Sequence, residues 1–262
     1  MLQDFNYHTH TYRCGHAIGS DEDYVLAAIK AGYKTLGFSD HAPYRHHPNP
    51  RIHMNWDQID DYLDSIRALK DKYQDQITIL TGFESEFYPE TIDEKLELQK
   101  RSDYLILGQH FAYPDGRGTY FKYNTDEEII TYAKGVCAGL ESGLFIYLCH
   151  PDVYMFRQNE FTAACAEAAH MICQKAAETN TPVEINVHRI NRGKIDFGQD
   201  GFQYSYPHRN FWKIASQYPL KCLIGIDAHD PEELLDLAAV EAAFAELSDL
   251  NLDYITEPFI LR

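Results

Sequence analysis

The apolar residues of this chain fall into two patterns that alternate along the sequence. Short runs of β-branched and other apolar residues predict strands at 3–7, 34–38, 77–81, 103–107, 145–148, 183–187 and 222–226. Longer amphipathic stretches between them predict helices near 21–31, 57–73, 91–100, 126–142, 160–179, 207–217 and 231–247. Seven strand-then-helix units in succession indicate an α/β protein with a parallel sheet.

Two of the predicted helices carry start signals. Ser20 followed by Asp23 has the spacing of a capping box, which places the start of the first helix directly after Ser20. Pro231, followed by Glu232 and Glu233, suits the first turn of the last long helix. Proline is tolerated at that position, and acidic side chains are favoured near the positive end of the helix dipole.

A parallel sheet of this kind either closes into a barrel or stays open as a doubly wound sheet. An open sheet that binds nucleotides is expected to carry GxGxxG or GxxxxGK[ST] after its first strand, and this chain has neither motif there. The 262 residues also suit one large barrel better than two small domains. We therefore expect a (β/α)7 barrel that forms a single domain over residues 1–262.

Composition and charge narrow the range of partners. The chain is 45% hydrophobic and 13% aromatic, which is enough to bury a sizeable core. Its 40 acidic and 23 basic residues give a formal net charge of -17. Such a charge repels polyanions, so we expect no nucleic-acid partner. A small anionic substrate remains possible if a few arginines are concentrated at one site.

Cysteine usage and hydropathy favour the cytoplasm. The six cysteines are scattered and form no CxxC pair. The first residues lack the basic and apolar regions of a secretory signal, and no apolar run approaches the length of a membrane span. We therefore expect a cytoplasmic protein with free thiols and no membrane partner. The sequence does not indicate an oligomeric state.

Side chains that bind metals occur at the C-terminal end of every predicted strand. In chain order they are His8 and His10, Asp40 and His41, Glu84 and Glu86, His110, His150 and Asp152, Glu184, Asn186 and His188, and Asp227 and His229. The C-terminal ends of the strands of a (β/α) barrel converge on one face, where such proteins build their active sites. A single HxH or DxH pair is weak evidence, but seven strand ends in phase strongly indicate a metal site.

The spacing within these groups has a geometric meaning. Residues i and i+2 of a strand point the same way, so His8 and His10 can reach one ion, and Asp227 and His229 repeat the arrangement. Imidazole together with carboxylate suits zinc, manganese or iron, whereas Mg²⁺ and Ca²⁺ prefer oxygen ligands. The ligand types do not decide among the first three metals.

The order of these motifs resembles a known family. They are HTH at 8–10 with the following His16, SDHAP at 39–43, GFESEF at 82–87, GQH at 108–110, CHPD at 149–152 and GIDAHDP at 225–231. The chain resembles the polymerase and histidinol phosphatase (PHP) superfamily over nearly its whole length. Within that superfamily it resembles the monofunctional histidinol-phosphate phosphatases, on its length, on SDHAP and on the insert that follows.

The resemblance implies a distorted seven-stranded barrel with three divalent metal ions at the C-terminal ends of its strands. It assigns nine ligands: His8, His10, Glu84 and Asp227 to the first ion, Glu84 with His110 and His150 to the second, and His16, His41 and His229 to the third. It also implies hydrolysis of L-histidinol phosphate by a metal-activated hydroxide. Glu84 would then act as the bridging carboxylate. Asp40 and Asp227 are candidates for proton handling, although either could be a plain ligand or an anchor for a histidine.

Binding of the substrate requires further side chains. Arginine can bind two phosphate oxygens at once, and the loops after the fifth and sixth strands supply three candidates, Arg157, Arg189 and Arg192, with His188 beside them. Each arginine could instead be a solvated loop residue. The imidazole and amino groups of histidinol would need acidic or amide partners, for which Glu86, Asp152 and Asn186 are candidates.

Two alternatives stay open. A PHP phosphoesterase for a nucleotide, a sugar phosphate or a phosphotyrosyl protein would use the same ligands, so only the loops at 42–55, 111–124 and 188–204 could distinguish it. A non-catalytic metal-binding barrel would be expected to have lost ligands. Every position of the pattern that we can identify is filled, including Glu84 and His229, so the enzymatic interpretation is favoured.

Overall fold

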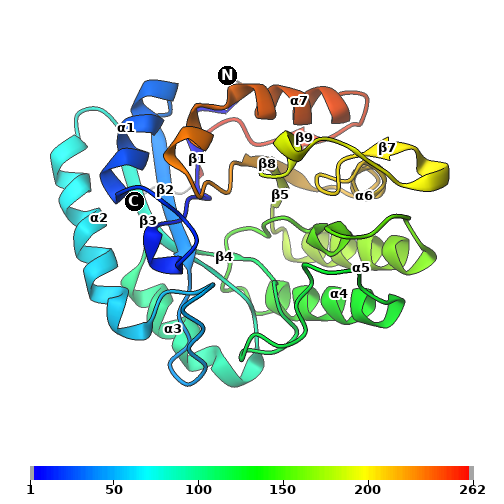
Figure 1. Cartoon of the computed structure of the whole chain (residues 1–262), viewed down its shortest axis with the longest axis horizontal. Coiled ribbons are helices and arrows are strands. Elements are labelled where there is room, and N and C mark those ends of the chain that lie inside the picture. The colour runs from blue at the N-terminus through cyan, green and yellow to red at the C-terminus, as the bar shows by residue number, and fades with distance from the viewer. Residues whose placement is uncertain (1–2, 260–262) are drawn as a thin grey trace.

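Helices surround a curled parallel sheet in the computed structural model, which describes residues 3–259 (Figure 1). Residues 1–2 and 260–262, the ends of the expected domain, lie outside the described residues. The α-helices of the described part are α1 (Asp21–Ala31), α2 (Ile59–Tyr73), α3 (Ile92–Arg101), α4 (Asp126–Glu141), α5 (Ala163–Thr179), α6 (Arg209–Ala215) and α7 (Leu237–Leu247). The alternation of strands and helices predicted from the sequence is confirmed.

The sheet consists of two groups of parallel strands. The first group pairs β1 (Phe5–Asn6), β2 (Thr35–His41), β3 (Thr78–Ser85) and β4 (Tyr104–Leu107) in chain order. The second group pairs β5 (Val183–Asn186), β8 (Lys221–Gly225) and β9 (Asp253–Tyr254). All of these pairings are parallel, as strand–helix–strand connections require.

Single-residue bridges connect the two groups. Leu148 pairs with Leu107 of β4 on one side and with Val183 of β5 on the other. Beyond the last residues of β1 and β8, Thr9 pairs with Ala228. The predicted strand at 145–148 is therefore reduced to one bridging residue, because the chain turns at His150, whose φ is 29°.

Amide side chains complete the contact between β1 and β8. Gln3 Oε1 accepts a hydrogen bond from the backbone N–H of Ile224, and Asn6 Oδ1 accepts one from the backbone N–H of Ile226, each at 3.0 Å. The Asn6 amide also donates to the backbone oxygen of His8 at 3.0 Å. Both amides are buried. They take the place of ladder bonds at this contact and hold His8 in position.

Two separate hydrophobic clusters pack against the sheet. The larger one lies between the strands and the helices, and the smaller one draws on strands from both groups: Phe5, Tyr7, Leu80, Tyr104, Ile106, Tyr147, Cys149 and Leu223. The smaller cluster therefore fills the inside of the curled sheet. Tyr104 spans this interior and donates its hydroxyl to the backbone oxygens of Tyr7 (2.7 Å) and Phe38 (2.9 Å).

Local signals gave some boundaries correctly and missed others. The capping box of Ser20 and Asp23 is present and α1 begins at Asp21, as predicted. The single helix predicted over 231–247 is wrong: a 3₁₀ helix covers Pro231–Leu235 and α7 starts at Leu237. Asp236 lies between them and caps α7 with its side chain, which separates the two segments.

The segment predicted as a loop over 188–204 contains a small antiparallel hairpin of β6 (Ile195–Asp196) and β7 (Phe202–Gln203). None of the helices in the described part of the chain is long and apolar enough to cross a membrane.

We expect Asn6→Ala to lower the free energy of unfolding by about 1–3 kcal/mol, because it leaves the buried N–H of Ile226 without an acceptor. Chemical denaturation with a two-state fit measures the change. Gln217→Ala, which removes an exposed amide, is the matched control and should change stability little. A loss no larger than that of the control would contradict the role given to Asn6.

Candidate metal centre

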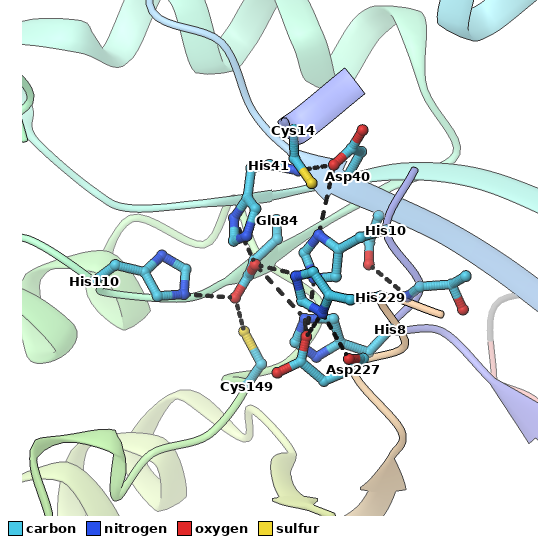
Figure 2. Close-up of polar contacts among 12 residues, drawn as sticks. His8, His10, Cys14, Asp40, His41, Glu84, His110, Cys149, Asp227 and His229 are labelled. Atoms are coloured by element: carbon cyan, nitrogen blue, oxygen red, sulfur yellow. Dashed lines mark hydrogen bonds and ion pairs between the residues drawn. The ribbon is translucent and has the colours of Figure 1, made fainter. Parts of the chain in front are cut away.

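The ligands expected at the strand ends meet in one buried cluster (Figure 2). Glu84, the second-last residue of β3, lies at the centre of the cluster. The ends of the other strands bring histidines and Asp227 around it. The sequence predicted that Asp40 and His41 follow the second strand. In the structure they are the last two residues of β2. The cluster is closed toward the core, since Glu84 is only 1% exposed.

Four donor atoms form a first set around one point. His8 Nε2 lies 3.3 Å from Asp227 Oδ1 and 3.6 Å from Glu84 Oε2. His10 Nε2 lies 3.0 Å from the same Asp227 oxygen and 3.6 Å from the same Glu84 oxygen. These are the four residues that the family resemblance assigns to the first ion.

The second oxygen of Glu84 belongs to another set. Oε1 lies 3.2 Å from His110 Nε2 and 2.7 Å from His150 Nε2, and the two imidazole nitrogens are 3.2 Å apart. The left-handed φ of His150 turns its side chain toward Glu84. Glu84 thus offers one oxygen to each set, as a bridging carboxylate would.

The remaining histidines lie at the outer side of the cluster. His16 Nε2 and His229 Nε2 are 3.1 Å apart, and His229 is also close to His10 and His41. His41 points its Nδ1 at Glu84 Oε2, 2.9 Å away. The structure therefore brings all nine of the expected ligands together, with His41 placed between the Glu84 oxygen and His229.

Acceptors behind the cluster fix the orientation of four histidines through their Nδ1 atoms. Those of His8 and His110 face the carboxylates of Glu184 (2.9 Å) and Glu86 (3.0 Å). Those of His16 and His229 face the backbone oxygens of Cys14 (3.0 Å) and Asp227 (2.9 Å). A histidine that donates from Nδ1 presents an unprotonated Nε2, which is the form that binds metals.

The electrostatics of the cluster are dominated by burial and by its carboxylates. Burial opposes a charge on His10, but hydrogen bonds to Asp227 and Asp40 raise its pKa to about 9. Burial and the charge on His10 together lower the pKa of His41 to about 3. Burial would raise the pKa of Glu84, yet its histidine neighbours hold that pKa well below the usual range. The cluster thus keeps its carboxylates ionised and attracts positive charge.

The donor set fits divalent metal ions. His8 Nε2 is buried without a hydrogen-bond partner among the described residues, and Glu84 Oε2, 3.6 Å away, has only the ion-pair contact from His41 Nδ1 at 2.9 Å besides the first set. In a tetrahedral site with bonds of about 2.0–2.2 Å the ligand atoms lie roughly 3.4 Å apart, which is close to the separations in the first set. Histidine with carboxylate is the donor chemistry of zinc and related transition metals.

Two glycines make room for the buried carboxylates. A Cβ on Gly108 would lie 2.0 Å from Glu84 Oε1, and a Cβ on Gly225 would lie 2.2 Å from the Glu184 carboxyl carbon. Both glycines are therefore required by close approach of a side chain that belongs to the metal centre or supports it.

A cavity of about 500 Å³ opens above the cluster. Metal-centre residues form its floor, and its walls include Ile52, Phe121, Phe156, His188, Arg189, Arg192, Tyr206, Asp230 and Glu233. Three expected substrate-binding residues, His188, Arg189 and Arg192, thus line the cavity. Arg157 is not among the lining residues and lies with its guanidinium 5.3 Å from the centre of the Phe156 ring.

The cavity arginines have no acidic partner among residues 3–259. No side chain of the described residues forms an ion pair with Arg189 or Arg192, and Arg189 Nε is buried without a hydrogen-bond partner. Burial lowers the pKa of Arg189, and the nearby charges of Arg192 and Arg157 lower it further. Tyr206 raises it in part. Arg189 is half-buried and Arg192 is exposed, and two unpaired guanidinium groups at the wall of a cavity form a site for an anion.

Several candidates from the sequence point away from the cavity. Asp40 is buried and accepts hydrogen bonds from Thr11 and from the backbone of His41, so it supports the cluster from behind. The three candidates for the histidinol moiety are also fully enclosed: Glu86 faces His110, Asp152 accepts from the backbone of His208 at 2.6 Å, and Asn186 donates to Glu184 and Asp227. Asp227, in contrast, lines the cavity.

Sequence reasoning missed the aromatic wall. Phe121, Phe156 and Tyr206 line the cavity, and none belongs to a motif. Their only signal was their place in loops or after a strand end, which many aromatic residues of this chain share.

The sequence from residue 6 to residue 188 matches the family model of the PHP domain. The chain belongs to the PHP family. This match confirms the family resemblance from which the ligand assignment was made, and the motif at 225–231 lies beyond the matched range.

Three similar proteins are histidinol phosphatases by name. The chain is 25% identical over 239 residues to a probable histidinol-phosphatase of Deinococcus radiodurans, covering 87% of this chain and 86% of that protein. It is 30% identical over 153 residues to the histidinol-phosphatase of Bacillus subtilis, covering 54% and 56%. Its fold is similar to the crystal structure of a Lactococcus lactis histidinol phosphate phosphatase with zinc, L-histidinol and phosphate, with a TM-score of 0.74 over 97% of this chain and 95% of that chain at 17% identity.

Gly108→Ala should reduce metal content, because the new Cβ would displace the Glu84 carboxylate that both inner donor sets share. Elemental analysis of the purified variant against the parent protein measures the loss. Gly135→Ala is the control: this α4 glycine has an ordinary φ and its Cβ would meet Gln109 only at 3.6 Å. Unchanged metal content in Gly108→Ala would show that Glu84 does not depend on this space.

Proposed function

We propose that this PHP protein is a metal-dependent phosphatase that hydrolyses L-histidinol phosphate to L-histidinol and inorganic phosphate. The observation that carries the proposal is the cluster of nine expected histidine and carboxylate ligands, six of which line a cavity with unpaired arginines: His16, His41, His110, His150, Asp227 and His229. The three similar proteins bear the name of this activity, and the fold neighbour was solved with its products, histidinol and phosphate.

The proposed centre holds three divalent ions, of zinc, manganese or iron. His8, His10, Glu84 and Asp227 would hold one, Glu84 with His110 and His150 a second, and His16, His41 and His229 a third. Divalent ions at such a site lower the pKa of bound water toward about 7 and neutralise the charge of a phosphoryl group.

The short bridges at Leu148 and Thr9 support the further proposal that the curled sheet is a distorted seven-stranded barrel forming a single domain.

The side chains of the chain supply the rest of the chemistry. Arg189 and Arg192 bind phosphate oxygens from the wall of the cavity, and His188 lies beside them. Asp227 borders both the cluster and the cavity, so it is the better placed of the two aspartates to accept or return a proton. Asp40 instead holds His10 from behind, where its Oδ1 lies 3.5 Å from His10 Nδ1.

The walls of the cavity suit a small substrate with a ring. Phe121, Phe156 and Tyr206 offer flat apolar surfaces, and Phe156 is already contacted by the Arg189 guanidinium at 4.5 Å. The acidic side chains of Asp230 and Glu233 line another part of the same cavity, where they can face an amino group. A small phosphate ester is therefore the proposed partner.

A second candidate is another small phosphate ester. Ile52, Phe121 and Arg189 reach the cavity from the loops at 42–55, 111–124 and 188–204 respectively, so all three loops contribute to its walls. Since the metal ligands would be common to both reactions, the choice of ester depends on these loops.

Metal-loaded protein should release phosphate from L-histidinol phosphate with a kcat/KM several orders of magnitude above that for nucleotides, sugar phosphates and phosphotyrosine. Steady-state phosphate release on this panel makes the comparison. Glu84→Ala should abolish turnover, because it removes the carboxylate shared by two donor sets. A better rate on another ester would reject histidinol phosphate as the substrate, and no turnover of any ester at full metal loading would reject the phosphatase.

Arg189→Met and Arg192→Met should each raise KM roughly ten- to a hundred-fold, since a hydrogen bond to a charged group contributes about 1.5–3 kcal/mol. The same assay with varied substrate concentration measures this effect. Arg117→Met is the matched control, because Arg117 is exposed and paired with Asp115. Unaltered KM in both cavity variants would remove them from phosphate binding.

A further inference from the structure

Glu86 is the meeting point of three buried hydrogen-bond donors. Its Oε1 lies 3.0 Å from His110 Nδ1 and 3.2 Å from His53 Nε2, and its Oε2 accepts the Tyr44 hydroxyl at 2.7 Å. Glu86 is 1% exposed, does not line the cavity and would not hold a metal ion. The proposed function uses this carboxylate only to orient His110, and its contacts with His53 and Tyr44 have no part in that role.

Two of the three donors come from one loop. Tyr44 and His53 lie near the two ends of the 42–55 loop, and both are buried, with their rings 5.3 Å apart. Ile52, which directly precedes His53, lines the cavity. Arg45 and Arg51, which lie between Tyr44 and His53, are exposed, and Arg45 forms an ion pair with Glu97 at 2.6 Å. Glu86 therefore fastens both ends of a loop that forms part of the cavity wall.

A buried cation stands close to this carboxylate. Lys95 of α3 is fully buried, and its ammonium lies 3.7 Å from the centre of the Tyr44 ring. No hydrogen-bond partner for its Nζ exists among the described residues. A buried carboxylate is costly without opposite charge nearby, and a cation over an aromatic ring is attracted to its face. Lys95 supplies that charge from the face of the Tyr44 ring and forms no ion pair with Glu86 in the described part of the chain.

Glu184 provides an internal comparison. It anchors His8 Nδ1 at 2.9 Å just as Glu86 anchors His110, but its other partner is Asn186 of the same strand. Within the described residues, no hydrogen bond joins the Glu184 side chain to a cavity loop. Anchoring a metal-ligand histidine therefore needs only one carboxylate–histidine pair, and the loop contacts of Glu86 exceed that need.

We propose that Glu86 is a positioning residue that couples the metal ligand His110 to the 42–55 loop. A divalent ion on His110 fixes the imidazole with its Nδ1–H toward Glu86, and the oriented carboxylate then holds Tyr44 and His53. By reciprocity, the closed loop favours metal binding at His110 by the same free energy. This coupling rests on the metal centre of the proposed function but not on histidinol phosphate as the substrate.

Limited proteolysis of the full chain with trypsin tests the coupling. Arg45 and Arg51 are exposed cleavage sites within the loop, and Arg67 and Lys72 on α2 serve as reference sites in the same digest. Saturating Zn²⁺ should slow cleavage at Arg45 and Arg51 about fivefold or more relative to chelator-treated protein, which is the lower range of common coupling free energies. Cleavage at the reference sites should change much less.

Glu86→Gln should remove most of this metal-dependent protection. The neutral amide accepts hydrogen bonds from His110 and His53 more weakly than the charged carboxylate does. Glu184→Gln is the matched control: it should weaken metal binding but retain the protection once Zn²⁺ is saturating. Glu86→Asp should restore part of the effect. Metal content and far-UV circular dichroism of each variant, measured without substrate, separate loss of coupling from loss of fold.

If Glu86→Gln does not fold, Tyr44→Phe tests the same coupling by removing a single hydroxyl on the loop side. It should speed cleavage at Arg45 and Arg51 in the metal-loaded protein, while the metal content at saturating Zn²⁺ stays unchanged. The proposal is overturned if Zn²⁺ protects all four sites equally, if it protects none, or if a folded Glu86→Gln or Tyr44→Phe keeps the full protection of the parent chain.

Discussion

The site depends on keeping one carboxylate both buried and ionised. Glu84 is 1% exposed and divides its two oxygens between two groups of imidazoles. A buried carboxylate would normally become protonated, since ionisation in an apolar surrounding is expensive. Here the ring of histidines holds its pKa well below the usual range. Because those histidines come from the ends of different strands, the charge on Glu84 is stable only when the whole sheet is folded around it.

The backbone is adapted to this carboxylate at several points. Gly108 leaves the space that a Cβ would take from Glu84 Oε1, and His150 adopts a left-handed φ to face the same oxygen. Asp227 also has a positive φ, of 56°, and projects into the first donor set. Non-glycine residues in this conformation cost on the order of 1–3 kcal/mol and persist where their surroundings fix them. His150 and Asp227 both belong to the cluster of expected ligands, whereas Asn180, which also has a positive φ, ends α5.

The sequence predicted which side chains gather in the cluster better than it predicted the side chains that support them. These side chains could be identified because they lie at or just beyond the C-terminal ends of strands, and the strand ends of a parallel sheet converge whatever the exact boundaries. Glu86 lies two residues after Glu84, and strand periodicity alone would point both the same way. β3 ends at Ser85, so Glu86 leaves that direction and faces the back of His110. Likewise Arg157 and Arg189 both follow strand ends, and only the packing around Phe156 decides which one reaches the cavity.

The charge of the chain can be reconciled with an anionic substrate only locally. A net charge of -17 repels phosphate at long range, but salt screens that repulsion beyond about 8 Å under physiological conditions. Within that distance the donor cluster, once it carries divalent cations, and the unpaired Arg189 and Arg192 reverse the sign of the field. Five buried carboxylates, those of Asp40, Glu84, Glu86, Glu184 and Asp227, surround the histidines. That negative charge is suited to retaining multivalent cations, and it is the retained cations, with the arginines, that make the cavity attractive to a phosphate ester.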